Sequence, residues 1–476
     1  MKAFTGMVSG AVALLKEKAR RQKAKRRGRP ARFFLFAFSF CLSSLALAAS
    51  AATLQVGPDE TYPTIQSALD ACTSGDVIIV ADGYYNTAGF YTVDLKGKNV
   101  EIRSKNGPDA CILSGPSSGW TVFRVHTGET RDARISGFTM FGSVSTENSS
   151  PTIEGNVFLG CRVNCFGGSP LITNNVFLRF ADKWPIACNQ CTSVTISGNS
   201  ITDCGAGIQC ISTPSVTVVG NRLIGNRGTA IWCYSCATVE VAGNMIAANV
   251  STSTSESSAA SGIRCYDSTT ARIVNNVVAG NSGHRAIAVN KGTLFFANNT
   301  IAFNAGGESG GGLSCGAAAT VLNSIFWGNT AGNGSPVSFG YDYTAAIGSI
   351  DHCCIEGGKS GVFAGTFYYL EWGSGNIESD PLFVDAGRWL DPLESWPAQF
   401  VAGDYRLRPA SPCVDAGGPA DDVPATDYAG RPRSLDGDAD GTAAPDVGAY
   451  EYPGAQSAVL YVDDDAPMTR GMAIHR

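Results

Sequence analysis

Two pairs of cysteines have the spacing of metal ligands. Cys188 and Cys191 lie in ACNQC, and Cys233 and Cys236 lie in WCYSC 45 residues further along the chain. Two C-x-x-C pairs are a common signature of a tetrahedral zinc site. Whether one zinc ion can collect all four sulfurs depends on where the fold places the two pairs.

An acidic turn near the C-terminus suggests a second kind of metal site. In DGDADG, the carboxylates of Asp436, Asp438 and Asp440 alternate with small residues and precede a glycine. This order matches the first half of a calcium loop. The twelfth position is Val447, so the bidentate glutamate of such loops is missing and Asp446 is the candidate substitute. The sequence predicts a structural calcium ion here, and the alternative is an acidic turn that is only solvated.

An internal repeat must position these residues. Segments such as ISGNSITDC, VAGNMIAAN and FANNTIAFN share a GN or NN pair, and the period is about 22 to 23 residues. The second residue of each pair is Asn156, Asn175, Asn199, Asn221, Asn244, Asn276, Asn299 or Ser324. Short β-branched runs alternate with turn residues, without a helical period. This pattern predicts an all-β fold, a single-stranded right-handed parallel β-helix. A leucine-rich repeat or a propeller would need other signatures.

Stacking the coils turns repeated residues into columns. A second asparagine-rich column follows the first by five residues, and stacked amides can hydrogen-bond from coil to coil. A third column comprises Cys165, Cys188, Cys210, Cys233, Cys265, Val289 and Cys315. Because valine replaces cysteine once, the cysteines in this column are interpreted as small buried apolar residues.

The cysteine column bears directly on the zinc hypothesis. Cys188 and Cys233 are two coils apart, and coils stack about 4.8 Å apart. One zinc ion with bonds of about 2.3 Å cannot gather both pairs. Neighbouring thiols in a column have parallel Cβ directions, and about 4.8 Å exceeds the roughly 3.5–4.5 Å that a disulfide needs. We therefore expect stacked free thiols and no zinc.

The strand that carries the cysteine column presents its alternate side chains to solvent. These outward residues are Ala187, Gln209, Trp232, Arg264, Ala288 and Ser314, with Asn189, Ile211, Tyr234, Tyr266 and Asn290 in the next column. The aromatic rings can stack against sugars, and an arginine can hold a carboxylate. The sequence thus predicts a carbohydrate-binding surface at Trp232, Tyr234, Arg264 and Tyr266. The alternative is a set of surface aromatics that only cover the sheet.

The two ends of the repeat carry further motifs. TIQSALDAC predicts a short amphipathic helix, and DVIIVA predicts a strand. TIQSALDACTSGDVIIVADGYY, followed by KNVEIRSKNGPDACILSG, resembles the first coils of bacterial secreted β-helix proteins of the pectin-lyase-like superfamily. The resemblance implies an N-terminal cap with the first coils over residues 52–115 and the β-helix over residues 116–360. We expect a disulfide between Cys72 and Cys111 to staple this cap.

The C-terminal region resembles a different family. SGNIESDPLFVDAG, GDYRLRPASPCVDAG and RPRSLDGDADGTAAPDVGAYEY occur in the order found in choice-of-anchor Q domains, which follow such β-helices. This implies a capping region over residues 361–452, in which Cys354 and Cys413 are the candidates for a second disulfide. The tail, residues 453–476, contains AVLYVDDDAP, which resembles the start of a further, truncated module.

These families host lyases, hydrolases, epimerases and non-catalytic surface proteins, so the resemblance implies a fold better than a reaction. The outward columns hold no cluster of Asp or Glu, which acid–base catalysis or a calcium-dependent lyase would need. Asp351 and His352, in SIDHCC, faintly resemble a pectate-lyase motif but fall in register with the repeat. The catalytic residues are unknown. We expect a polysaccharide-binding or surface-structural protein, with a calcium-dependent lyase of pectate-lyase type as the alternative.

The first 51 residues predict export. A segment with eleven Lys/Arg and one acid precedes FFLFAFSFCLSSLALA and the small residues AASAA, as in a cleaved signal peptide; a membrane anchor is the alternative. The remaining chain has 24 Lys/Arg and 40 Asp/Glu, a net charge of −16, which disfavours nucleic acid as a partner. We expect a secreted or cell-surface monomer that meets a polysaccharide or cell-envelope glycan and has no transmembrane span after signal removal.

Overall fold

The computed structural model describes residues 51–86, 91–115, 120–181, 184–251, 260–306, 310–331, 336–340, 346–390, 400–419 and 422–454. The predicted export signal and nearly all of the tail lie outside these ranges. Among the described residues, no helix is long and apolar enough to cross a membrane.

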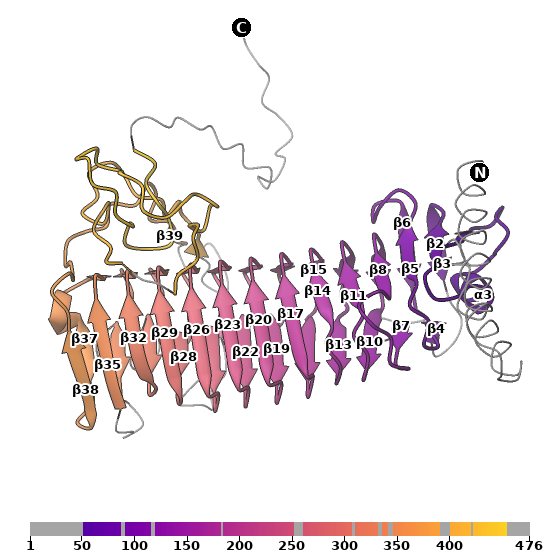
Figure 1. The fold of residues 1–476 in the computed structure, drawn as a ribbon, viewed down its shortest axis with the longest axis horizontal. Coiled ribbons are helices and arrows are strands. Elements are labelled where there is room, and N and C mark those ends of the chain that lie inside the picture. Colours follow the sequence, from indigo (N-terminus) through magenta and orange to yellow (C-terminus); the bar gives the residue numbers. More distant parts are fainter. Residues whose placement is uncertain are drawn as a thin grey trace, which may run out of the picture. The chain divides into compact units, whose positions relative to one another are not determined.

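Three parallel sheets, here named A, B and C, wind around one core (Figure 1). Sheet A contains β1 (Thr53–Val56), β2 (Val77–Val80), β5 (Glu101–Ser104), β8 (Arg134–Ser136), β11 (Thr152–Glu154), β14 (Leu171–Thr173), β17 (Ser193–Ser197), β20 (Ser215–Val219), β23 (Thr238–Ala242), β26 (Thr270–Val274), β29 (Thr293–Ala297), β32 (Ala318–Leu322), β35 (Ala346–Asp351) and β38 (Tyr368–Trp372). Sheet B contains β3 (Gly83–Asn86), β6 (Cys111–Ser114), β9 (Thr139–Phe141), β12 (Val157–Leu159), β15 (Val176–Leu178), β18 (Ser200–Thr202), β21 (Arg222–Ile224), β24 (Met245–Ala247), β27 (Val277–Ala279), β30 (Thr300–Ala302), β33 (Ile325–Trp327) and β36 (Cys354–Ile355). Sheet C contains β4 (Tyr91–Asp94), β7 (Thr121–Val125), β10 (Ser143–Glu147), β13 (Val163–Phe166), β16 (Ile186–Asn189), β19 (Ile208–Ile211), β22 (Ile231–Tyr234), β25 (Ala260–Tyr266), β28 (Arg285–Val289), β31 (Leu313–Cys315), β34 (Val337–Phe339) and β37 (Val362–Ala364).

Each coil contributes one strand to each sheet, and alternate side chains of a strand enter the core. In β20, Val216 and Val218 are buried while their neighbours face outward. β-Branched residues suit such strands because they pack well on a pleated surface. The predicted parallel β-helix is therefore confirmed.

The asparagine column is a continuous hydrogen-bonded ladder. The Oδ1 atom of Asn244 accepts from the backbone N–H of Asn221 at 2.8 Å and from its Nδ2 at 3.0 Å. In turn, Asn244 Nδ2 donates to Asn276 Oδ1 at 2.9 Å and to the carbonyl of Val218 at 2.9 Å. These buried amides satisfy backbone groups that the turn leaves unpaired, so the column is structural.

The residue before each ladder asparagine has a positive φ, as do the residues before Ser324 and Cys353 at the same turn, so the turn requires glycine or a residue that tolerates the left-handed region. The φ values are 61° at Gly155, 54° at Asn174, 64° at Gly198, 66° at Gly220, 61° at Gly243, 57° at Asn275, 53° at Asn298, 47° at Asn323 and 48° at His352. His352 therefore occupies a turn position of the repeat.

The predicted cysteine column lies inside the core on sheet C. Cys165, Cys188, Cys210, Cys233 and Cys265 face one another from coil to coil, and all are free thiols. Hydrogen bonds among neighbouring thiols, from Cys165 in the first place, together with burial raise the pKa of Cys188 well above its usual value. The column is a row of buried thiols from which water is excluded.

The predicted N-terminal helix is present as α3 (Ile65–Ala71), which buries Ile65 and Leu69 in the same core as the coils. Cys72 and Cys111 are both free thiols in this structure, and the expected disulfide between them stays a prediction. The Cys72 thiol turns back to donate to the carbonyl of Leu69 at 3.2 Å.

The C-terminal segment, residues 377–454, packs on the outside of sheet B (Figure 1). It contains one short antiparallel pair, β39 (Arg388–Trp389) and β40 (Phe400–Val401), and η1 (Gly358–Gly361) lies before it. An apolar cluster joins the segment to the coils; its buried members are Met245, Ala247, Ala248, Val277, Ala279, Ala302, Ile325, Cys354, Phe383, Phe400, Tyr405, Leu407, Cys413, Val447 and Ala449. The small residues on sheet B let the aromatic rings approach the backbone closely.

Candidate functional site

The strand register of sheet C brings the predicted carbohydrate-binding residues together. In the pairing of β22 with β25, Trp232 lies opposite Arg264 and Tyr234 lies opposite Tyr266. Period-two alternation places Cys233 and Cys265 in the core between them, so these four side chains share the outer face. All four are at least partly exposed.

The four side chains form one cluster of rings around a cation, here named the aromatic patch. The Arg264 guanidinium lies 5.3 Å from the ring centroid of Trp232 and 5.3 Å from that of Tyr266. The rings of Tyr234 and Tyr266 are stacked, with centroids 5.8 Å apart. Cation–π contacts and ring stacking hold the patch in one arrangement.

Sequence reasoning missed one member of the patch. Trp184, in the connection before β16, lies with its ring centroid 5.6 Å from that of Trp232. It is not part of the repeat, so no column of the sequence indicated it. Within the described part of the chain, the indole Nε1 of Trp232 is buried and has no hydrogen-bond partner.

A charged pair borders the patch. Lys291 Nζ lies 3.0 Å from Oδ1 of Asp267 on the preceding coil, and both side chains are exposed. The Asp267 carboxylate raises the pKa of Lys291, with smaller contributions from Tyr266 and Tyr234. The patch is thus flanked by a lysine that stays protonated at neutral pH.

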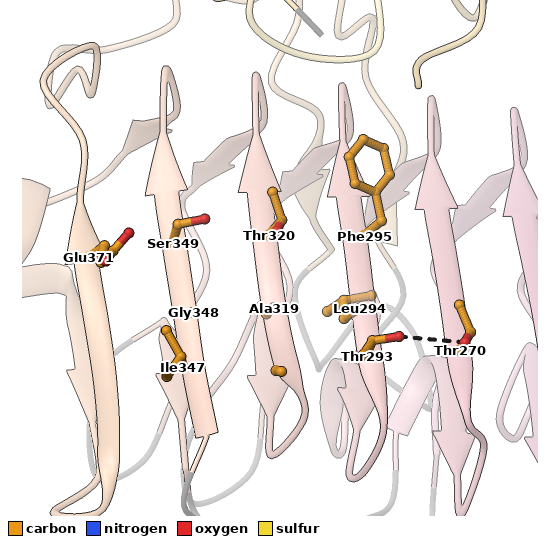
Figure 2. A pocket seen from close by; sticks show the side chains of 11 residues that line it. Thr270, Thr293, Leu294, Phe295, Ala319, Thr320, Ile347, Gly348, Ser349 and Glu371 are labelled. Atoms are coloured by element: carbon orange, nitrogen blue, oxygen red, sulfur yellow. Dashed lines mark hydrogen bonds between the residues drawn. The ribbon is translucent and has the colours of Figure 1, made fainter. Parts of the chain in front are cut away.

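Sheet A carries an open groove with a volume of about 340 Å³ (Figure 2). It runs across β26 to β38, from Thr270 at one end to Glu371 at the other, and small residues such as Ala319 and Gly348 line it. Glu371 is the only carboxylate among its lining residues. The groove therefore lacks the pair of carboxylates that glycoside hydrolysis commonly uses.

Asp351 and His352 have structural surroundings. Asp351 Oδ1 accepts from the backbone N–H groups of His352 at 3.0 Å and Gly375 at 3.2 Å. The His352 ring is wedged between two glycines, since an added Cβ at Gly375 or Gly418 would lie 2.4 Å or 2.6 Å from it. A side chain held in this way is a poor candidate for catalysis on a polymer.

The acidic turn is assembled differently from the predicted calcium loop. Asp436 and Asp438 meet Asp415, with carboxylate oxygens of all three within 4.8 Å of one another. Asp440 and Asp446 are not in this group.

Local contacts explain why the predicted ligand set needs this correction. Asp440 Oδ1 accepts from the backbone N–H of Thr442 at 2.7 Å. Asp446 is 1% exposed, and its carboxylate accepts from the N–H groups of Asp415 and Tyr452. Burial and the nearby Glu451 raise the pKa of Asp446 to about 8. Asp446 therefore belongs to the interior of the C-terminal segment.

The sequence matches the family described as "Right handed beta helix region" over residues 74–246 and 166–301. The chain also resembles the crystal structure of pectate lyase Pel9A, with a TM-score of 0.39 and 14% identity over 84% of this chain and 97% of that one. No curated protein matches it significantly in sequence. The family match stops before residues 375–452, so the resemblance to choice-of-anchor Q domains stays a prediction. Fold, register and family match together identify the chain as a right-handed parallel β-helix protein.

Proposed function

We propose that this protein binds polysaccharide through the aromatic patch on sheet C. The observation that carries the proposal is the placement of the Arg264 guanidinium between the rings of Trp232 and Tyr266 on adjacent coils. Such a surface offers flat apolar rings to the C–H faces of sugars and a cation to an acidic substituent. Because the rings are already packed on one another, little side-chain entropy is lost on binding.

The partner we propose is a polymer, such as a cell-envelope glycan. The patch lies on the outside of a sheet, and its residues come from two successive coils and from the connection before β16. A shallow face of this kind contacts several sugar units weakly, whereas a small ligand needs a concave pocket that buries most of its surface.

A calcium-dependent polysaccharide lyase is the second candidate. It would require acidic residues to hold calcium and a basic residue to abstract a proton. Lys291 is an exposed base that borders the patch, but it is paired with the carboxylate of Asp267. The described outward columns of sheet C offer no further carboxylates beside it, which favours binding over cleavage.

Substitution of Trp232 tests the binding proposal. W232A should weaken retention in affinity electrophoresis on the best-bound glycan by about tenfold or more, because ring–sugar stacking and the Arg264 contact are lost together. Y369A is the matched control, since Tyr369 is 64% exposed on β38, away from the patch. Equal retention of W232A and the unmodified protein, with the fold intact by circular dichroism, would overturn the proposal.

The lyase candidate is tested by release of unsaturated uronate from a panel of acidic polysaccharides, with and without calcium. We expect binding without release. Calcium-dependent release that K291A abolishes would instead establish the lyase.

We also propose that the acidic turn binds a structural calcium ion, with Asp415, Asp436 and Asp438 as ligands. Besides the proximity of their carboxylates, the Oδ1 atom of Asp415 is buried without a hydrogen-bond partner among the described residues. Calcium prefers such oxygen ligands. Calorimetry should detect one site that D438N weakens and that D440N leaves largely unchanged; equal effects of the two variants would contradict this ligand set.

We further propose that residues 1–51 direct export, on the basis of their basic and apolar segments. N-terminal sequencing of the protein recovered outside the producing cells should start near residue 52. Recovery of the intact N-terminus in the membrane fraction would favour an anchor.

A further inference from the structure

Two cysteines meet where the C-terminal segment contacts the end of the solenoid. Cys354, in β36, and Cys413, in the C-terminal segment, belong to the same apolar cluster, and both are 0% exposed. Their thiols are close enough to hydrogen-bond, and this contact, followed by burial, strongly raises the pKa of Cys354. In this structure both are free thiols.

The surrounding backbone holds the two residues in place from both sides. The Cys354 thiol donates to the carbonyl of Ser379 at 3.2 Å. Two residues further on, the carbonyl of Pro381 accepts from Ser411 Oγ at 2.6 Å, and Ser411 Oγ accepts from the backbone N–H of Cys413 at 3.1 Å. The carbonyl of Cys413 accepts from Val447 at 2.9 Å. The Cys354 thiol and the backbone of Cys413 are therefore both held by hydrogen bonds to neighbouring residues.

The adjacent Cys353 points elsewhere. Strand alternation turns it into the solenoid core, where it belongs to a different cluster. Its thiol contacts the carbonyls of Val321 at 3.7 Å and Asp351 at 3.3 Å. Of the two neighbouring cysteines, only Cys354 faces the C-terminal segment.

We propose that Cys354 and Cys413 form a disulfide that locks the C-terminal segment onto the last coil when the protein folds under oxidising conditions. The two thiols lose two protons and two electrons as the S–S bond forms. The electrons reduce a disulfide of a thiol–disulfide oxidant, such as oxidised glutathione, to two thiols.

The burial of both thiols sets the timing of this reaction. An oxidant cannot reach either sulfur once the segment has docked, and the raised pKa of Cys354 leaves little of its reactive thiolate. Oxidation therefore occurs during folding, before docking is complete. The folded reduced protein should oxidise slowly, at the rate at which the segment opens.

Peptide mapping tests the pairing directly, without dependence on export or glycan binding. The denatured, reduced chain is refolded with a mixture of reduced and oxidised glutathione, alkylated under denaturing conditions and digested with trypsin without reduction. We expect residues 292–359 to be linked to the peptide that contains Cys413. C354S and C413S should lose this link, whereas C353S should keep it.

The mechanical consequence is measured by hydrogen exchange. Reduction should raise exchange at Val447 and Gly448 about tenfold or more in the unmodified protein and in C353S, and leave C354S unchanged. Alkylation of both Cys354 and Cys413 after oxidative refolding would overturn the proposal, as would a link that persists in C354S.

Discussion

The turns between sheets A and B use one backbone conformation in two ways. At Gly198, Gly220 and Gly243 the left-handed residue has no side chain. The outward residues that follow include Ser200 after the first and Arg222 after the second, whereas Met245 and Ala247 follow the third. At Asn275, Asn298 and Asn323 it has an amide, and the outward residues that follow are small or apolar. The positive φ is needed in both groups, so the difference must lie in what the side chain contacts.

The three asparagines bind the C-terminal segment. Asn275 Nδ2 donates to the carbonyl of Thr426 at 2.7 Å, and Asn298 Nδ2 donates to that of Asp446 at 3.4 Å. Asn323 makes a reciprocal pair with Gly418, donating at 2.8 Å and accepting at 2.9 Å. Asparagine at this position therefore supplies polar contacts on three of the coils that the segment covers; the strand that follows Gly243 is covered as well, through Met245 and Ala247.

The strands beneath the segment, starting with the one after Gly243, carry small outward residues. Ala247, Ala279 and Ala302 are fully buried beneath the segment. Gly280 lies against the ring of Phe400, and an added Cβ there would approach it to 1.9 Å. Small residues of sheet B thus form the surface on which the C-terminal segment packs, and the asparagines supply polar contacts at the edge of that surface.

The largest loss of stability is expected from a substitution in the inner asparagine ladder, and it should exceed the loss at these outer contacts. N244A removes an amide that satisfies several buried groups in three coils. We expect a loss of about 3–5 kcal/mol in unfolding free energy, because each buried polar group left without a hydrogen-bond partner costs about 1–3 kcal/mol. Urea unfolding measures it. N244S should recover part of the loss, as Ser324 fills this column naturally; equal stability of N244A and the unmodified protein would contradict the ladder's role.

A smaller effect is expected at the outer contacts. N323G keeps the positive φ without strain and removes only the side chain that pairs with Gly418. Hydrogen exchange at Gly418 should accelerate about tenfold, corresponding to about 1.4 kcal/mol, while the overall unfolding midpoint changes little. G220A is the opposite control, since it strains the backbone without touching the segment. A large decrease in the overall unfolding midpoint of N323G would contradict the proposed difference between the glycine and asparagine turns.

The docked segment should also respond to pH. The pKa of Asp446 is raised to about 8 by burial and by Glu451, so the folded state favours its protonated form. The stabilisation of the fold that comes from keeping Asp446 protonated is fully present below the usual aspartate pKa. It is lost as the pH rises through about 8. Exchange at Tyr452, corrected for its intrinsic pH dependence, should rise several-fold between pH 6 and 9. D446N should flatten this response, and a fall in exchange would contradict the sign.

The smallest effect is expected in the cysteine column. Val289 occupies this column with 1% exposure, so C210V should cost less than about 1.5 kcal/mol in unfolding free energy. C210S buries a hydroxyl in the same place and should cost more. Thermal unfolding of the two variants makes the comparison. A greater loss in C210V would show that the sulfur itself matters.

The repeat could be predicted from the sequence because each coil makes the same local choices. A turn residue, a ladder asparagine and alternating β-branched residues recur at one period, so fold, register and the outward aromatics of β22 and β25 follow from spacing alone. The sequence also carried the residues that contact the segment, as asparagine in place of glycine before the ladder position, although Asn174 has the same residue outside the docked coils and Gly243 precedes a covered strand.

Only the tertiary structure decided which non-repeated residues meet. Trp184 joins Trp232, Asp415 replaces Asp440 and Asp446 beside Asp436, and Cys354 faces Cys413. These contacts join segments that are distant in sequence or lie outside the period. Their partners depend on how the C-terminal segment packs, and long-range packing leaves no periodic signal in a single sequence.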